Sequence, residues 1–347
     1  MRNYLIVGPA WVGDMVMAQS LFITLKQLYP DCKIDVVAPA WSLPILARMP
    51  EVNAGIALPV AHGKLALLAR WRLGKQLRQQ YYTHAIVLPR SWKSALVPYF
   101  ARAGVRTGYR GEMRYGLLND IRELDKSVLT QTVQRFVAHA YQKNQQHPAA
   151  IATPYPALKI NKQNVEDLLN KLGLNTLRPV IGFMPGAEYG RAKQWPVQYF
   201  AELAEKLIAA GYQIWIFGSN KEVSMGDEII SFFPAHAINL CGKTQLVDVV
   251  DLISCCEQIV SNDSGLMHVA AAVNVKVNAI YGSSTPDYTP PLTNTAVIHY
   301  KRLQCSPCFE RTCQYGHYNC LSMIYSNDVF AEIVNKSNSD AVMASAE

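Results

Sequence analysis

The sequence lacks a long hydrophobic run, and this excludes one class of protein at once. No uninterrupted apolar stretch approaches the roughly 18 to 20 residues that a helix needs to cross a bilayer. The first residues do not resemble a signal peptide, because Pro9, Gly13 and Asp14 interrupt the apolar region and no small-residue cleavage pattern follows. We therefore interpret the N-terminus as a first core strand and predict a cytoplasmic protein.

Charged residues are also scarce, at 17% of the 347 residues, whereas half of the chain is hydrophobic. Such a composition buries a large core and argues against disorder. The net charge of +7 is concentrated, since Val60 to Lys126 holds 13 Lys or Arg and only 4 Asp or Glu. This surplus indicates an anionic partner, such as phosphate, nucleic acid or a membrane surface, or else a solvated basic face.

Short apolar runs alternate with helical patterns along the whole chain, which predicts an α/β fold built from parallel βαβ units. Strands are expected at residues 3–8, 33–39, 84–89, 105–110, 179–186, 212–219, 258–263 and 277–282. Helices are expected at residues 15–29, 41–49, 64–80, 94–103, 165–173, 199–211, 225–233, 246–256 and 268–274.

A polar, Pro-rich segment, residues 145–156, divides this pattern into two halves. We predict an N-terminal Rossmann-like domain at residues 1–150, a second at 151–330, and a tail at 331–347 that looks frayed after about Val334. In such folds ligands bind at the carboxyl ends of the strands, so two domains facing across a cleft are expected to share a site.

The stretch SNDSGLMHVAAA, Ser261 to Ala272, joins a strand to a helix. Helix N-termini present free N–H groups and a positive dipole end, which suits a phosphate. Ser264 and Gly265 allow close approach of an anion, Asp263 suits sugar hydroxyls, and His268 lies one turn into the helix. The alternative is structural: Asp263 caps the helix and His268 is a satisfied helix histidine.

A second corner, GAEYGRAKQWP, follows the strand that ends near Gly186. Glu188 lies within it, and Lys193 is placed to neutralise a diphosphate, unless it is an ordinary exposed loop lysine. Two phosphate-suited corners in one domain favour a nucleotide site.

The corner PAWVGDMVM in the first half lacks the GxGxxG dinucleotide fingerprint. Asp14 stands where its helix begins. It is either an N-cap or, if it faces a cleft, a general base for a hydroxyl.

Six segments together resemble the ADP-heptose:lipopolysaccharide heptosyltransferases of glycosyltransferase family 9: PAWVGDMVM, RTGYRGEMRYGLLND, PGAEYGRAKQWP, FGS, NDSGLMHVAAA and YGSSTPDYTPP. The resemblance spans roughly Asn3 to Asp328, and Arg106 to Asp120 is typical of the type II enzymes. It implies the GT-B architecture, two Rossmann-like domains facing across a cleft. It also implies inverting transfer of heptose from ADP-L-glycero-D-manno-heptose to the first heptose of heptosyl-Kdo2-lipid A in the lipopolysaccharide inner core.

The resemblance assigns roles residue by residue. Asp14 matches the general base, and Lys193 the lysine that stabilises the leaving diphosphate. The residues matched or placed at the donor are Gly186, Glu188, Lys193, Glu222, Asp263, Ser264, Gly265 and His268. We expect no cofactor and no metal, since a DxD pair, which binds metal in the other transferase architecture, is absent.

The resemblance implies a partner for the basic first half, namely the anionic lipid-linked acceptor. Candidate acceptor-binding residues are Arg90, Lys93, Arg106, Arg110 and Arg114, since arginine binds phosphate and carboxylate in bidentate fashion. Basic and apolar residues on the helix from Lys64 to Gln80 suit peripheral contact with the anionic cytoplasmic face of the inner membrane, although an ordinary surface helix fits as well. No nucleic-acid partner is expected.

Four clustered cysteines, Cys305, Cys308, Cys313 and Cys320, have no assigned role. Zinc binding is one interpretation, but the spacing is not that of two CxxC pairs, and reduced thiols or an adventitious disulfide suit the cytosol better. Alternatives for the whole chain are a heptosyltransferase of type I or III, or a sugar-nucleotide epimerase of the same architecture.

Overall fold

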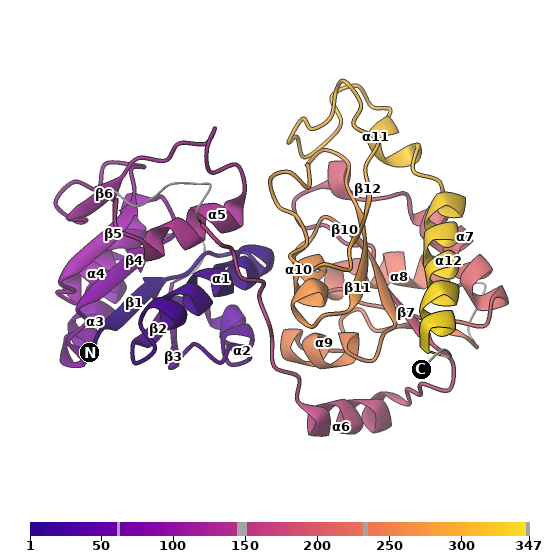
Figure 1. The fold of residues 1–347 in the computed structure, drawn as a ribbon, viewed down its shortest axis with the longest axis horizontal. Helices are drawn as coiled ribbons and strands as arrows, with labels where there is room; N and C mark the ends of the chain where they lie inside the picture. Colours follow the sequence, from indigo (N-terminus) through magenta and orange to yellow (C-terminus); the bar gives the residue numbers. More distant parts are fainter. Residues whose placement is uncertain (61–62, 144–150, 232–234, 345–347) are drawn as a thin grey trace. The chain divides into compact units, whose positions relative to one another are not determined.

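The computed structural model describes residues 1–60, 63–143, 151–231 and 235–344, with side chains described up to Asn335. The chain divides into two compact units, Met1–Lys159 and Ile160–Glu347. Each unit is a parallel sheet with helices packed against it (Figure 1). The division follows Lys159, later than the predicted boundary at residue 150, and residues 144–150 of the predicted linker lie outside the described residues.

The N-terminal unit has a six-stranded sheet in the order β3-β2-β1-β4-β5-β6, and all its pairings are parallel. Its strands are β1 (Asn3–Val7), β2 (Lys33–Ala38), β3 (Ala54–Ala57), β4 (His84–Val87), β5 (Val105–Tyr109) and β6 (Asp120–Arg122). Its helices are α1 (Val12–Leu28), α2 (Leu43–Leu46), α3 (Leu67–Leu77), α4 (Leu96–Phe100) and α5 (Thr132–Val137), with short 3-10 turns at Ala40–Ser42, Arg78–Gln80, Trp92–Ala95 and Ala138–Ala140.

The C-terminal unit repeats this plan with the strand order β12-β11-β10-β7-β8-β9. Its strands are β7 (Val180–Met184), β8 (Gln213–Ile216), β9 (Ala237–Asn239), β10 (Gln258–Asn262), β11 (Lys276–Ile280) and β12 (Val297–His299). Its helices are α6 (Lys162–Leu172), α7 (Val197–Ala209), α8 (Val223–Ile230), α9 (Leu246–Ile253), α10 (Gly265–Ala272), α11 (Asn319–Ser322) and α12 (Ser326–Ala344), with 3-10 turns η7 (Arg191–Lys193) and η8 (Asn220–Glu222).

The central strands form because their sequences are apolar without interruption. β7, VIGFM, is buried at every position, and four of the five residues of β1, NYLIV, are buried. Strands covered on both faces by helices have this continuous pattern rather than an alternating one. The expected central strands are therefore all present, whereas the short edge strands β3, β6, β9 and β12 carry too few apolar residues to be recognised from sequence.

Both sheets have the strand order of the dinucleotide-binding Rossmann fold. The order in which the strands are added to the sheet reverses between β1 and β4 in one unit and between β7 and β10 in the other, while these neighbouring strands remain parallel. This confirms the predicted α/β class with two Rossmann-like units. Folds with this strand order bind ligands at the reversal point, at the carboxyl ends of the strands. The corners singled out in the sequence follow β1, β7 and β10, so they lie at these points.

The tail predicted at residues 331–347 begins inside a helix, and the part after Val334, expected to fray, continues that helix. α12 continues through Ala344, and Val329 and Ile333 on it are fully buried in the core of the C-terminal unit. The helix packs on α7 (Figure 1). The apolar stripe on α12 is short, and the polar residues around it hide its helical pattern in the sequence.

Candidate active site

Two corners of the C-terminal unit are tied together by one buried amide. Asn262, the last residue of β10, donates from Nδ2 to the carbonyl of Pro185 at 2.7 Å and accepts from the backbone N–H of Trp195 at 3.0 Å. Its side chain is fully buried. Asn262 therefore fixes the segment after β7, which carries Lys193, against the segment after β10, which carries Asp263.

The centre of the site is an ion pair between these two segments. The ammonium of Lys193, in η7, lies 2.5 Å from Oδ2 of Asp263, and the Oγ hydroxyl of Ser284 donates to the same oxygen at 2.5 Å. The Asp263 side chain is 5% exposed and that of Lys193 18%. Lys193 is thus a paired, largely buried cation rather than an exposed loop lysine.

His268 lies beside this pair, in the first turns of α10. The ring is buried, and Nδ1 has no hydrogen-bond partner among the described residues. Burial lowers the pKa of His268 to about 4, aided by the nearby Lys193 and opposed by Asp263, so the ring is neutral at pH 7. A buried polar atom without a partner is uncommon, and it leaves Nδ1 available to a ligand group. The alternative of a satisfied helix histidine does not fit.

The start of α10 is open. Its N-cap residue is Ser264, not Asp263, and the Ser264 side chain makes no capping hydrogen bond. Gly265 is the first helical residue. The alternative that Asp263 caps the helix is therefore wrong, and the first-turn N–H groups keep the positive end of the helix dipole without a side-chain acceptor from the cap residue.

Two further candidates meet at the ends of β7 and β8. Gly186 packs against Glu222, since a Cβ at Gly186 would lie 2.8 Å from Glu222 Cγ. Oε2 of Glu222 accepts from the backbone N–H and the hydroxyl of Ser219 at 2.7 Å each, in a capping box. Glu188 pairs with the exposed Lys221 at 2.6 Å. Gly186 and Glu222, both predicted at the donor, are therefore in contact, while Glu188 contacts Lys221.

In the N-terminal unit, Asp14 stands at the corner between β1 and α1. Trp11 is the N-cap residue of α1, so Asp14 is the third residue of the helix and not its N-cap. Its side chain is partly exposed. A carboxylate in the first turn is favoured by the helix dipole, which stabilises its ionised form.

All five predicted acceptor-binding residues make contacts within the protein, and Arg106 and Arg114 each bind two or more backbone carbonyls. Arg114 is 2% exposed, and its guanidinium donates to the carbonyls of Pro89, at 2.7 Å, and Tyr109. Burial lowers the pKa of Arg114 to about 10. Arg106 donates to the carbonyls of Leu117 and Ala103 at 2.7 Å each. Arg114 holds its own loop and does not fit a ligand-binding role, because burial closes access to it.

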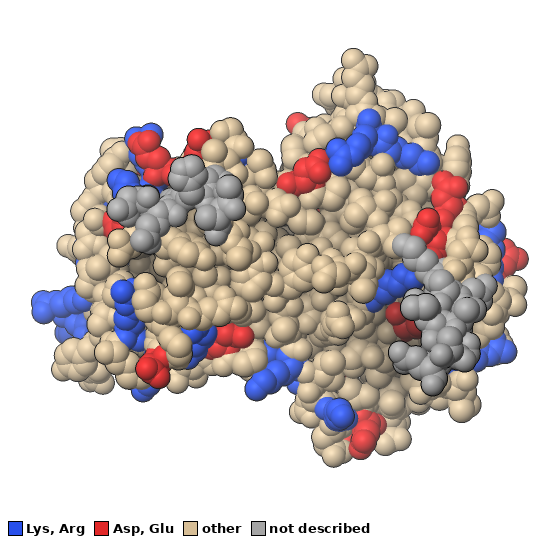
Figure 2. Space-filling model, in the orientation of Figure 1, with Lys and Arg blue, Asp and Glu red and all other residues tan. Residues whose placement is uncertain are grey.

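The other three basic candidates are accessible. Arg90 is exposed and donates to the carbonyl of Arg110 at 3.0 Å, and Lys93, which is partly exposed, donates to the carbonyl of Gly63 at 2.8 Å. On the face drawn in Figure 2, basic side chains of this unit form separate groups interspersed with acidic ones.

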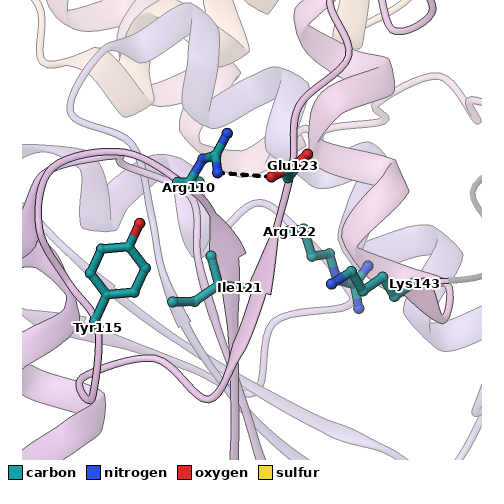
Figure 3. A pocket seen from close by; sticks show the side chains of 6 residues that line it. All are labelled: Arg110, Tyr115, Ile121, Arg122, Glu123 and Lys143. Carbon is teal, nitrogen blue, oxygen red and sulfur yellow. Dashed lines mark ion pairs between the residues drawn. The ribbon is translucent and has the colours of Figure 1, made fainter.

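Arg110 lines a hollow of about 350 Å³ at the ends of β5 and β6. Figure 3 shows the six residues that line it: Arg110, Tyr115, Ile121, Arg122, Glu123 and Lys143. Arg110 pairs with Glu123 at 2.8 Å across one side. Arg122 pairs with Asp120 at 2.9 Å and Arg110 with Glu123, so of the three lining cations Lys143 contributes the net positive charge that suits an anionic group.

The basic helix predicted at residues 64–80 is shorter, as α3, and its charges differ in exposure. Arg70 is buried and donates to the carbonyl of Leu65 at 2.7 Å, which removes it from any membrane-facing set. Arg78 donates to the carbonyl of Phe100 at 2.7 Å. An exposed apolar patch remains at the start of the helix, and it consists of Leu65, Leu67, Leu68 and Trp71.

The four clustered cysteines are free thiols, as are the other four. The pKa of Cys320 is raised to about 11 by burial and by the neighbouring Cys305, Cys308 and Cys313, whereas backbone N–H groups of residues 315–318 lower that of Cys313. Among the described residues, no group of three or more His, Cys, Asp or Glu side chains is arranged to hold a metal ion. Within the same part of the chain, no helix is long and apolar enough to cross a membrane.

Comparison with known proteins identifies the family. A model of glycosyltransferase family 9 (heptosyltransferase) matches residues 70–319. The chain belongs to glycosyltransferase family 9. Lipopolysaccharide heptosyltransferase 2 of Escherichia coli is 50% identical over 301 residues, covering 85% of this chain and 86% of that protein. Lipooligosaccharide heptosyltransferase 2 of Haemophilus influenzae is 49% identical over 306 residues, covering 85% and 88%.

A solved structure of this family shares the fold. The structure of E. coli ADP-heptose lps heptosyltransferase II superimposes with a TM-score of 0.85 at 44% identity, covering 96% of this chain and 97% of the other. The family 9 resemblance and the GT-B architecture predicted from sequence are thus confirmed. This glycosyltransferase carries the Lys193–Asp263 pair at the reversal point of its C-terminal sheet, where a Rossmann-like unit binds a nucleotide.

Proposed function

We propose that this family 9 glycosyltransferase transfers L-glycero-D-manno-heptose, with inversion, from ADP-heptose to the first heptose of heptosyl-Kdo2-lipid A. The observation that carries the proposal is the buried cluster of Lys193, Asp263 and the unpartnered His268 at the reversal point between β7 and β10. The identity of about half to curated type 2 heptosyltransferases supports this reaction over that of a type I or III enzyme or an epimerase.

The C-terminal unit binds the donor in this proposal. Lys193 and the open first turn of α10, from Gly265, face the diphosphate, whose negative charge grows as the glycosidic bond to the leaving ADP breaks. Preorganised hydrogen-bond donors of this kind often lower the activation barrier more than any other feature of an active site. Asp263 binds Lys193 and Ser284 through Oδ2. Its other oxygen, Oδ1, accepts a hydrogen bond from a heptose hydroxyl. Neutral His268 adds a hydrogen bond through Nδ1.

Asp14 is the general base of the proposed reaction. Inversion requires a single displacement, with one base that removes the proton of the attacking hydroxyl on the face opposite the leaving group. Asp14 lies in the first turn of α1, where the helix dipole favours a negative charge of the kind that this role requires. The proposed reaction uses no cofactor and no metal.

The acceptor is anionic, since it carries phosphate groups and Kdo carboxylates. We place it against the accessible cations Arg90, Lys93 and Arg110, and the hollow lined by Arg110, Tyr115 and Lys143 is suited to one of its acidic groups. Arginine forks bind carboxylate and phosphate in bidentate fashion.

The decisive experiment is a transfer assay with purified ADP-heptose and heptosyl-Kdo2-lipid A, analysed by mass spectrometry of the lipid product. Addition of one heptose is the expected result, with no addition to Kdo2-lipid A lacking the first heptose. Equal transfer to Kdo2-lipid A would indicate a type I enzyme. Conversion of the nucleotide sugar without any lipid acceptor would indicate an epimerase.

We further propose that the enzyme works at the cytoplasmic face of the inner membrane, through the exposed patch of Leu65, Leu67, Leu68 and Trp71. Lys75 supports this membrane contact by placing a cation beside the patch, since its ammonium lies 5.0 Å from the centre of the Trp71 ring. An apolar patch flanked by cations is the pattern of interfacial helices.

Sedimentation with phosphatidylglycerol-rich vesicles tests this membrane contact. Leu68→Glu should reduce the bound fraction severalfold, because it places a carboxylate where an apolar chain would enter the interface. The matched control is Leu177→Glu, at a leucine of the C-terminal unit that is 91% exposed. Equal binding by both variants and the unaltered enzyme would remove the patch from the proposal.

A further inference from the structure

The side chains of the Lys193–Asp263 cluster carry no net positive charge. Lys193 is the cation closest to the proposed diphosphate site, but Asp263 lies 2.5 Å from its ammonium and cancels its charge. His268 is neutral, because burial holds its pKa at about 4. A diphosphate bound here would lack a compensating side-chain charge, although a buried or half-buried anion requires one.

A second cation is built into the turn that carries Lys193. Arg311, in the long segment between β12 and α11, accepts a hydrogen bond at its carbonyl from the backbone N–H of Ala192 at 3.0 Å. The same carbonyl abuts Gly190, where a Cβ would lie 2.4 Å from it. Gly190 has a φ of +154°, and any larger residue there would push Arg311 away. The backbone of Arg311 is thus bonded to the residue next to Lys193.

The side chains of the two cations also meet a common aromatic ring. The Lys193 ammonium lies 5.1 Å from the centre of the Tyr189 ring, and the Arg311 guanidinium carbon lies 5.4 Å from it. The Tyr189 hydroxyl donates to the carbonyl of Phe309 at 2.5 Å, which anchors the ring to the same segment. Both cations therefore lie within cation–π distance of the same ring, Tyr189.

Arg311 differs from two other exposed cations of this unit, Arg302 and Lys221, in having no acidic partner. Arg302 pairs with Asp287 at 3.1 Å, and Lys221 pairs with Glu188. Among the described residues, no carboxylate lies within ion-pair distance of Arg311, whose side chain is exposed. Its charge is thus uncompensated and its five N–H donors are accessible.

We infer that Arg311 is a second cation of the donor site, which binds the diphosphate of the nucleotide sugar and of the departing ADP. The inference rests on the proposed function and adds a residue to it. Lys193, fixed by Asp263, positions the diphosphate, and Arg311 supplies the net charge. A guanidinium is suited to this because it grips two phosphate oxygens at once.

Calorimetric titration with ADP and with AMP tests the inference. Arg311→Met keeps an unbranched side chain and removes the charge, and it should raise the Kd for ADP by roughly 10- to 100-fold, the loss of one or two charge-assisted hydrogen bonds. The Kd for AMP, which lacks the second phosphate, should rise less. Arg311→Lys should recover part of the loss. Lys171→Met, at an exposed lysine in the last turn of α6, is the control and should bind both nucleotides normally.

The outcomes separate this inference from the function it rests on. If the unaltered enzyme transfers heptose and binds ADP, yet Arg311→Met binds ADP as tightly, the inference is wrong and the proposed function stands. Equal weakening for ADP and AMP, or a melting temperature that falls with the affinity, would make Arg311 a brace for the loop and would also overturn it. Absence of ADP binding by the unaltered enzyme would instead contradict the proposed function.

Discussion

The buried carboxylate of Asp263 offers the sharpest test of the donor site. We consider Asp263→Asn, which keeps the shape of the side chain and one acceptor oxygen but removes the charge. Oδ2 of Asp263 accepts two hydrogen bonds of 2.5 Å, from Lys193 and from Ser284, and its side chain is 5% exposed. The substitution therefore makes the Ser284 bond a neutral one and leaves the Lys193 ammonium bound to an uncharged amide oxygen, without a counter-charge.

The magnitude follows from these contacts. A hydrogen bond to a charged group contributes about 1.5–3 kcal/mol and a neutral one about 0.5–1.5, so the Ser284 bond loses about 1–1.5 kcal/mol, and loss of the Lys193 counter-charge costs about as much again. Lys193 is 18% exposed and regains part of this by hydration, which leaves an expected loss of about 2 kcal/mol. For a unit of this size that corresponds to a fall in melting temperature of roughly 4–8 °C.

Thermal unfolding and ADP titration should be measured on the same preparation. ADP affinity should stay the same or rise, because a negative charge beside the diphosphate has gone, while heptose transfer falls because a hydroxyl acceptor has gone. The control is Asp167→Asn, at an exposed carboxylate on α6, where a change within about 0.5 kcal/mol is expected. An unchanged melting temperature, or loss of ADP binding, would refute the role given to the pair.

Four further outcomes are expected. Asp14→Asn should lower the transfer rate by about 10²- to 10⁴-fold with ADP affinity retained, as measured by turnover and calorimetry; parallel loss of both would make Asp14 structural. Ser284→Ala should lower stability by about 2 kcal/mol in urea unfolding, and Ser284→Thr should preserve it. EDTA should leave the transfer rate unchanged, and strong inhibition would contradict a metal-free reaction. Burial holds the pKa of both His139 and His268 at about 4, against about 6.5 in the unfolded chain. Because the unfolded chain then binds more protons, the free energy of unfolding should fall as the pH drops from 6.5 toward 4, by about 2 kcal/mol per histidine at pH 5. His139→Gln should remove about half of this pH dependence.

Much of the donor site could be predicted from sequence because its residues lie in strand-to-helix corners. The segments around Lys193 and Asp263 each combine small, charged and polar residues after an apolar run, and parallel sheets bring such ends to one edge. The pairing of Lys193 with Asp263 was not predicted, because the two residues are 70 positions apart. Sequence reasoning assigned them separate partners in the donor, whereas the structure joins them to each other.

The basic first half shows where composition misleads. Arg70 lies on the helix predicted to contact the membrane, and Arg114 is a predicted acceptor-binding residue, yet both are buried with their guanidinium groups on backbone carbonyls. A guanidinium has five donors and a long apolar stem, so it serves equally well to satisfy loop carbonyls as to bind an anion. Only the surroundings of each arginine distinguish the two uses.

The sequence gives no role to the residues that position others, although Asn262 and Ser284 lie inside the quoted segments NDSGLMHVAAA and YGSSTPDYTPP. Asn262 and Ser284 carry ordinary polar side chains, and Arg311 lies in a segment marked out by its cysteines rather than its charge. Each acts through backbone or side-chain partners far along the chain: Asn262 on Pro185 and Trp195, Ser284 on Asp263, and Arg311 on Ala192.

The sequence by itself determined the α/β class, the central strands and the corners that hold the chemistry, because apolar periodicity and helix-start residues act over a few positions and are visible locally. The tertiary structure alone decided which charges are compensated, which are buried and which remain accessible. Those properties depend on the groups that folding brings within a few ångströms, and distance along the chain carries no information about them.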